Sequence, residues 1–536
     1  MKAIDRAIAA IAPRYAVKRA QARHVLAAYE AAQPSKRHKK SKDNSTGERQ
    51  VVRDAATTRA IARDLERNHD LVRGALTYLP RVIVGPTGIS IEPTPRTGKN
   101  PGDADYDDID DTFARQVLNL WREWTRNPEV TRTLDWVQVQ ELACRSWLRD
   151  GEVFVQLVEG NGAFIKHGSA VPLSIELLEA DVVPLQHTGE NPTIDAGIER
   201  NAWGQPTAYY VYKTHPGNGG FYSTSDLKRV PAERMLHLAN RERLSGLRGI
   251  SVMASAITRL LDLKDYEESE RIAARIAAAI AAYVKRDVNM EWTPPPIAAG
   301  EEGKQRDFFL EAGAVFQDTL PGEEIQMLNP NRPNTALDRF RQSQLRAAAR
   351  AFSLTYSGFA GDYDGTYSAQ RQELVEGYDG YRMLTGVMVS RFVRPIYERF
   401  IDMAIASGQL VVPKHIRPET VKQAVFRGPK MPWIKPTEEA EAVIMQSRAG
   451  IDSLTNAIAE RGGRMQDVFE QIARERRLAD ELGLVLDSDA RTDRAVAAPA
   501  PDNTDAGTDR NSNTSDDQGA RTRGPRLHAV GTGDSV

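Results

Sequence analysis

The chain has 536 residues, with 71 lysines and arginines against 73 aspartates and glutamates. This length accommodates roughly two to four domains. The nearly balanced charge excludes the strongly cationic field of a sequence-specific DNA-binding protein, so any contact with DNA is expected to be local or weak.

The single cysteine, Cys144, excludes an internal disulfide framework and a cysteine-rich zinc site. Its apolar neighbours predict a buried structural thiol rather than a reactive one. The sequence contains no uninterrupted apolar run of about 18 residues and no secretory signal at its amino end. We therefore expect a soluble protein that is not exported.

Residues 1–50 are expected to form a mobile N-terminal segment. Spaced apolar residues within 1–30 are compatible with an amphipathic helix on a membrane surface, an alternative that Pro13 and the lack of bulky aromatics disfavour. The basic run Lys36–Lys42 favours a solvated loop, with a nucleic-acid patch as the alternative.

Helical spacing of apolar residues follows over 51–83, up to the turn Gly85–Gly88, and again over 111–147. The period then changes to short β-like runs between Gly151 and Leu238. These runs are Val153–Val158, Leu173–Leu178, Ala208–Tyr212 and Arg234–Leu238. No helical pattern long enough for a parallel crossover separates them, so a mostly antiparallel β-rich domain is predicted.

A long helix is predicted over Ser251–Arg286, about 50 Å in length. Its alanine-rich part, Ile272–Tyr283, permits close packing of neighbouring helices. The irregular stretch Asn289–Asn334 reads as a small α/β excursion, and a helix over Thr335–Leu354 returns from it.

A loop rich in glycine, tyrosine and aspartate, Gly358–Gly365, precedes a long helix over Ser368–Ser407, interrupted near Pro395. Helical character resumes over Pro436–Leu486, and the polar tail 489–536 is expected to be disordered.

The sequence does not match the common catalytic and cofactor-binding motifs. A phosphate loop fails because Gly98-Lys99 is followed by Asn100 and Pro93 stands where the first glycine belongs. The acidic run 103–111 lacks the EF-hand glycine and glutamate, and reads as a solvated loop that begins a helix. No two histidines lie at i, i+4 spacing for zinc, and neither a nucleophile elbow nor a dinucleotide fingerprint occurs. We therefore expect no enzyme, cofactor or metal site.

An ordered set of landmarks between Arg53 and Leu486 resembles the portal proteins of lambda-type tailed phages. The landmarks are Ala62–Asn68, Val82–Ile89, Trp121–Trp124, Asp150–Phe154, Gly204–Tyr210, Val230–His237, Leu247–Ser251, Leu320–Ile325 and Gly361–Tyr363 through Tyr367-Ser368. The sequence departs from the family at Thr366–Ala369, where an Asn-Tyr-Ser-Ser-like tetrad is usual, and at Trp433–Pro436.

The resemblance implies an α+β portal-type fold that assembles as a ring. The implied parts are a wing over 51–250, stem helices over 251–286 and 335–354, a clip over 287–334, a tunnel loop over 355–367, a long helix with a return to the wing over 368–435, and a helical crown over 436–488.

The same resemblance implies a ring, usually of twelve identical subunits, at one capsid vertex, in the virion and in the host cytoplasm during assembly. Its implied partners are the terminase large subunit, the major capsid and scaffold proteins, a head-completion or tail connector protein, and double-stranded DNA held non-specifically; no membrane partner is implied. Two alternatives stay open: a head-morphogenesis enzyme such as a protease or nuclease, and a capsid adaptor that never contacts DNA.

Candidate residues follow from this assignment. The channel lining is expected to include Arg339, Arg346, Arg350, Tyr356, Asp362, Tyr363, Asp364 and Tyr367, and the docking surface of the clip Trp292, Pro294, Pro295 and Pro296. The three arginines share one helix face, from which they either touch the DNA backbone or pair between subunits with Glu267, Glu268 and Glu270. Within the helix, pairing at i, i+4 accounts for Glu267 and Arg271 without catalysis.

Overall fold

The computed structural model describes residues 45–98, 106–160, 165–190, 192–218, 227–279, 283–286, 323–326, 337–431, 435–459 and 463–484, with positions 12–14, 18, 461 and 486 besides. The chain divides into two compact units, Met1–Met465 and Gln466–Val536, which are described separately. The expectations for most of residues 1–44 and for 489–536, and those for Trp292 and Pro294–Pro296, lie outside the described residues.

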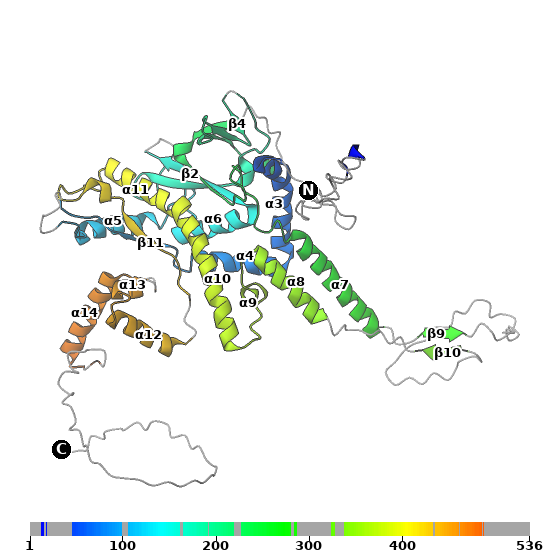
Figure 1. Ribbon diagram of the computed structural model, residues 1–536. Coiled ribbons are helices and arrows are strands. Elements are labelled where there is room, and N and C mark those ends of the chain that lie inside the picture. The colour runs from blue at the N-terminus through cyan, green and yellow to red at the C-terminus, as the bar shows by residue number, and fades with distance from the viewer. Residues whose placement is uncertain are drawn as a thin grey trace, which may run out of the picture. The chain divides into compact units, whose positions relative to one another are not determined.

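Four helices open the first unit (Figure 1): α3 (Gly47–Asn68), α4 (Asp70–Ile83), α5 (Asp111–Trp124) and α6 (Trp136–Asp150). Side chains define where they begin. Asp110 accepts a hydrogen bond from the Phe113 amide, which confirms that the acidic run leads into a helix, and Asp135 forms a capping box with Gln138. Helix α3 begins at Gly47, so the expectation of a mobile segment as far as residue 50 is wrong over its last four residues.

Two antiparallel sheets follow. One has the strand order β3 (Leu173–Glu179), β2 (Glu152–Glu159), β8 (Met235–Ala239). The other has the order β4 (Ile194–Asp195), β5 (Ile198–Arg200), β6 (Pro206–Tyr212), β7 (Leu227–Pro231). Short 3-10 helices lie at Ala180–Val182, Pro216–Asn218 and Ala232–Arg234. The four predicted strands are present and every pairing in the two sheets is antiparallel, which confirms that part of the sequence analysis.

Long helices make up the next part of the unit: α7 (Ile257–Ala279), α8 (Leu337–Ala351), α10 (Tyr367–Met388) and α11 (Arg394–Ala406). A π-helical turn, Val389–Val393, joins α10 to α11 just before Pro395, where an interruption was predicted. The helix predicted over Ser251–Arg286 is shorter than expected. Tyr283–Arg286 instead forms strand β9, because it pairs with β10 (Glu323–Gln326), a partner that the helical pattern did not reveal.

The expectation of an uninterrupted loop over 355–367 is also wrong in part. Helix α9 (Tyr356–Ala360) occupies its first half, because Thr355 caps the helix and Gly361 ends it in the left-handed region at φ 67°. Only residues 361–366 form the loop before α10.

Most of these elements share one large hydrophobic core, and a second, smaller cluster of buried residues packs around the four-stranded sheet. Strand β1 (Ser90–Pro93) pairs with β11 (Ala424–Arg427), which follows the 3-10 turn Pro418–Thr420. This pairing joins two segments of the unit that lie far apart in the sequence. A cluster of aromatic rings lies within the large core and consists of Trp121, Trp124, Trp136, Phe392 and Phe400. Cys144 lies in this core with 0% exposure, and burial raises the pKa of its thiol, which confirms the prediction of an inert cysteine.

The helical segment predicted over Pro436–Leu486 consists of three helices, α12 (Pro436–Arg448), α13 (Leu454–Ala459) and α14 (Met465–Leu482), the last of which forms most of the described part of the second unit. Among the residues described, no helix combines the length and apolar character needed to cross a bilayer.

Candidate functional site at the junction of α8, α9 and α10

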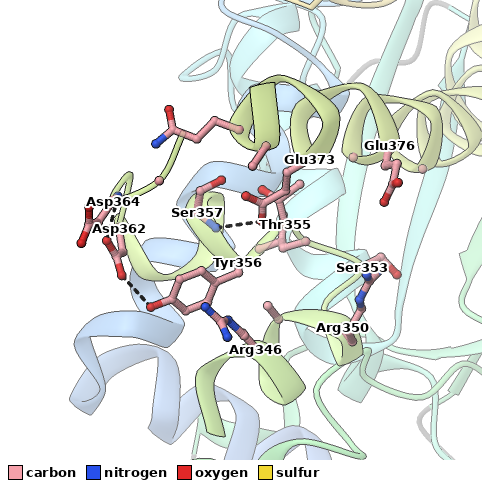
Figure 2. A pocket seen from close by; sticks show the side chains of 17 residues that line it. Arg346, Arg350, Ser353, Thr355, Tyr356, Ser357, Asp362, Asp364, Glu373 and Glu376 are labelled. Atoms are coloured by element: carbon pink, nitrogen blue, oxygen red, sulfur yellow. Dashed lines mark hydrogen bonds between the residues drawn. The ribbon is translucent and has the colours of Figure 1, made fainter. Parts of the chain in front are cut away.

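A pocket of about 560 Å³ lies where α8, α9 and α10 meet (Figure 2). Its walls come from the end of α8, the connection through α9, the loop 361–366 and the first half of α10. The lining residues include Arg346, Arg350, Ser353, Thr355, Tyr356, Asp362, Asp364, Gln370, Glu373 and Glu376. The pocket therefore gathers five of the eight residues that the sequence analysis assigned to the channel lining.

Hydrogen bonds hold α9 against α10. The Ser357 amide donates to the Glu373 carboxylate at 3.1 Å, and the Thr355 amide donates to the Tyr381 hydroxyl at 3.4 Å. Gly377 makes the close approach possible, because a Cβ atom there would lie 2.5 Å from the Thr355 methyl group. These contacts fix the base of the loop while leaving its far side in solvent.

A second set of contacts holds the loop itself. The Tyr356 hydroxyl donates to Asp362 at 2.7 Å, and the Asp362 carboxylate also accepts the Asp364 amide at 3.1 Å. The Arg346 guanidinium lies 5.1 Å from the centre of the Tyr356 ring, within cation–π range. We call this set, Arg346, Tyr356 and Asp362, the loop clasp.

The clasp also shifts the acidity of its members. The hydrogen bond from Tyr356 lowers the pKa of the Asp362 carboxyl below its usual value. Burial, reinforced by the bond to Asp362, raises the pKa of Tyr356 to about 12. Both groups therefore keep the protonation states that the clasp needs at neutral pH.

Opposite charges line opposite walls of the pocket. Figure 2 shows Arg346 and Arg350 on α8, facing Glu373 and Glu376 on α10, with Asp362 and Asp364 in the loop between them. With two arginines against four carboxylates, the pocket has no excess of positive charge. A site of this composition does not favour tight binding of a phosphate group, because neutralisation by cationic side chains is the main source of affinity for phosphates.

The structure brings together five of the predicted channel residues, which are Arg346, Arg350, Tyr356, Asp362 and Asp364. Tyr363 and Tyr367 lie beside the pocket and are 61% and 40% exposed. The Gln370 amide donates to the Tyr363 carbonyl, while Arg371 donates to the Tyr367 hydroxyl. Arg339 does not line the pocket, since it lies on α8 before the residues that form the wall.

Sequence reasoning missed the α10 wall. Glu373, Glu376 and Gln370 come from a helix that was read only for its apolar spacing. The available signal was Gly377, one turn after Glu373, because a glycine within a helix permits the close approach of a neighbouring segment.

A second polar cluster contains side chains of the kinds that bind metal ions, but they are engaged in ion pairs and hydrogen bonds. Potential ligand atoms of Glu179, Asp181 and His215 lie within 4.8 Å of one another. Arg59 and Arg63 bind Asp181 at 2.8 and 2.6 Å. The Gly217 amide donates to Nδ1 of His215, which leaves the proton of the neutral ring on Nε2, directed at Glu179. The cluster is therefore a network of ion pairs and hydrogen bonds.

Comparisons with known proteins agree on one class. The family model described as phage portal protein, lambda family, matches residues 34–384. The probable portal protein of Halomonas phage phiHAP-1 is 23% identical over 448 residues, which cover 81% of this chain and 82% of the relative.

Similar solved structures include a chain of the virion of a native gene transfer agent particle, with 13% identity, a TM-score of 0.44, and coverage of 78% of this chain and 99% of that one. A portal protein of the HK97 family from Corynebacterium diphtheriae has 15% identity and a TM-score of 0.28, over 60% of this chain and 85% of that one.

Proposed function

Because the chain belongs to the lambda family of phage portal proteins, we propose that it forms a closed ring at one capsid vertex and that its loop 361–366 lines the channel through which DNA passes. Proteins of this family are structural, and we assign this chain no catalytic role.

The observation that carries the channel proposal is the junction of α8, α9 and α10. A short loop presents the partly exposed Asp362 and the exposed Tyr363 and Asp364 while hydrogen bonds fix its base. A channel surface has to touch duplex DNA without retaining it, and each neutralised phosphate adds affinity by release of counterions. A loop that presents Asp362 and Asp364, with Arg346 and Arg350 set behind it, meets that requirement.

The larger parts follow the same assignment. We propose that the two sheets with α3–α6 form the wing, that α7 and α8 form the stem, and that α12–α14 contribute to the crown. The segment 287–334 is proposed as the clip. There Trp292 and Pro294–Pro296 would meet the terminase large subunit during packaging and a tail connector later. Twelve subunits, contacts with the capsid and scaffold proteins, and assembly in the host cytoplasm are also proposed.

The first experiment is electron microscopy of the purified protein, with particle mass measured in parallel. We expect closed rings of one defined mass with an axial pore. A monodisperse monomer or dimer that persists across protein and salt concentrations would refute the ring.

The channel surface needs its own test. In the double variant Asp362→Lys with Asp364→Lys, the ring should retain duplex DNA with a steeper salt dependence than the unchanged ring, because new positive charges face the phosphates. The control, Glu123→Lys with Glu233→Lys, adds the same charge at exposed sites in the wing. An equal effect of both variants would remove loop 361–366 from the channel.

A further inference from the structure

Helices α7 and α8 pack against each other in opposite directions. The Tyr266 and Phe340 rings lie 5.2 Å apart, Arg341 binds Glu267 at 2.7 Å, and Arg259 donates to Gln344. Residue numbers thus fall along α8 as they rise along α7. These contacts define the inner face of each helix and leave an outer face on the far side.

The outer face of α7 is acidic. Asp265 and Glu268 lie on it and are exposed, and within the described part of the chain no ion pair is recorded for them. Two apolar side chains, Leu261 and Ile272, share this face and are 37% and 47% exposed. An acidic strip with apolar side chains along it has the composition of a surface that another molecule covers.

The outer face of α8 is basic. Arg339, Arg346 and Arg350 are exposed and recur at spacings of seven and four residues, so they lie on one stripe. Arg346 and Arg350 also line the pocket at the junction of α8, α9 and α10, and Arg346 packs on Tyr356, whereas Arg339 lies outside that pocket. At about 100° per residue, this stripe lies about 120° around the helix from Phe340 and Gln344, which face α7. The pair of helices therefore carries an acidic surface on one side and a basic surface on the other.

The heights of the two surfaces match. Arg339 is adjacent to Phe340, which packs on Tyr266, so Arg339 lies at the level of Asp265 and Glu268. Subunits related by a closed cyclic axis are not displaced along it, so residues at one height meet when that axis runs along the helices.

We propose that the acidic outer face of α7 in one copy docks against the basic outer face of α8 in the next copy, with Arg339 between Asp265 and Glu268. The inference rests on the proposed ring and names the surfaces that close it. Two different faces on opposite sides make a head-to-tail contact, and every such contact is satisfied only when the ring closes. This arrangement reassigns Arg339 from the channel to the subunit boundary.

Two residues of the earlier pairing alternative are thereby excluded from the contact. Glu267 is engaged within the chain by Arg341, and Glu270 is buried. Glu268 alone of the three glutamates lies on the exposed acidic face.

The test uses two charge-reversed chains. One carries Asp265→Arg with Glu268→Arg, so that both of its outer faces are basic. The other carries Arg339→Glu, which places a negative charge opposite Asp265 and Glu268 of the next copy. Each alone should lose rings, with the ring fraction reduced about tenfold or more at low salt, since like charges then meet at every contact. Mixed in equal amounts, the two chains should assemble into rings in which they alternate.

Native mass spectrometry reads the outcome, because alternating rings contain equal numbers of the two chains. Circular dichroism checks that each variant folds, and Glu123→Arg on the exposed face of α5 is the matched control. Rings from either variant alone, or no rings from a mixture of folded chains, would overturn the docking surfaces while the ring of the unchanged protein stands. Absence of rings from the unchanged protein would instead overturn the proposed function, and the inference with it.

Discussion

Arg248 and Glu152 form an ion pair in which both side chains are 0% exposed, with a guanidinium nitrogen 2.7 Å from a carboxylate oxygen. Arg248 also donates to the carbonyls of Ala180, Val183 and Ala196, which lie in and between the two sheets. The pair therefore fixes the segment that leads into α7 to both sheets of the β-rich region.

Glu152 is the centre of this arrangement. It accepts hydrogen bonds from Arg59, His237 and the Gly249 amide as well as from Arg248. Burial by itself would raise the pKa of Glu152, but Arg248 and His237 outweigh it and hold that pKa far below its usual value. The carboxylate is therefore ionised at neutral pH.

Replacement of Arg248 by Met should lower the free energy of unfolding by about 3–5 kcal/mol, because it leaves a buried carboxylate without its main partner. Denaturant unfolding followed by circular dichroism measures the change. Arg53→Ala removes an exposed arginine that pairs with the exposed Asp54, and it should change stability by less than about 1 kcal/mol. A similar small effect of both substitutions would show that the buried pair is not a major source of stability.

His237 predicts a pH dependence. Burial lowers the pKa of His237 below its usual value of 6.5, although Glu152 opposes this, and Arg248 and Arg241 add to the lowering. The folded state therefore keeps His237 neutral while the unfolded chain binds a proton below about pH 6.5. The resulting stability is complete above pH 6.5 and declines as the pH falls.

The variant His237→Gln retains an amide donor for Glu152 but does not titrate. Between pH 7.5 and 5.5, the unchanged protein should lose more stability than the variant, by up to about 1.4 kcal/mol. Urea unfolding at the two pH values measures this. Parallel losses in both proteins would mean that folding does not lower the pKa of His237.

Substitution by alanine should change the stability of the protein in opposite directions at two glycines, Gly249 and Gly380. At Gly249 a Cβ atom would lie 2.1 Å from the Gly151 carbonyl oxygen, so Gly249→Ala must displace the start of the α7 segment. At Gly380, within α10, a Cβ atom would have no neighbour within 4 Å. Gly380→Ala should therefore raise the unfolding free energy by about 0.5–1 kcal/mol through the higher helix propensity of alanine. Thermal melting compares them, and destabilisation by Gly380→Ala would contradict the open space at that position.

The loop clasp predicts a local change in mobility. Tyr356→Phe removes the hydrogen bond to Asp362 and retains the ring beneath Arg346. Amide hydrogen exchange in 361–366 should accelerate about threefold or more, while exchange in α10 beyond Tyr378 stays unchanged. Tyr363→Phe is the control, because Tyr363 is 61% exposed and the Tyr356–Asp362 bond does not involve its hydroxyl. Equal acceleration in both variants would show that the clasp does not restrain the loop.

Local signals in the sequence were sufficient for many elements. Short runs rich in β-branched, aromatic and other apolar residues predicted β2, β3, β6 and β8, since such residues favour extended strands. Asp110 marked the start of α5 because a carboxylate there accepts an otherwise unpaired amide. The ordered landmarks indicated the family, and the match over 34–384 confirmed it.

Only the tertiary structure decided which distant residues meet. The pairing of Ser90–Pro93 with Ala424–Arg427, the placement of Glu373 opposite Arg346 and the burial of Arg248 on Glu152 depend on residues far apart in the chain. Periodicity and capping describe interactions within a few residues and carry no information on such partners. The sequence by itself thus determined the elements and the family of this protein. Packing determined the pocket, the buried ion pair and the two charged faces of α7 and α8, because these arise from the way in which separate helices and strands contact one another.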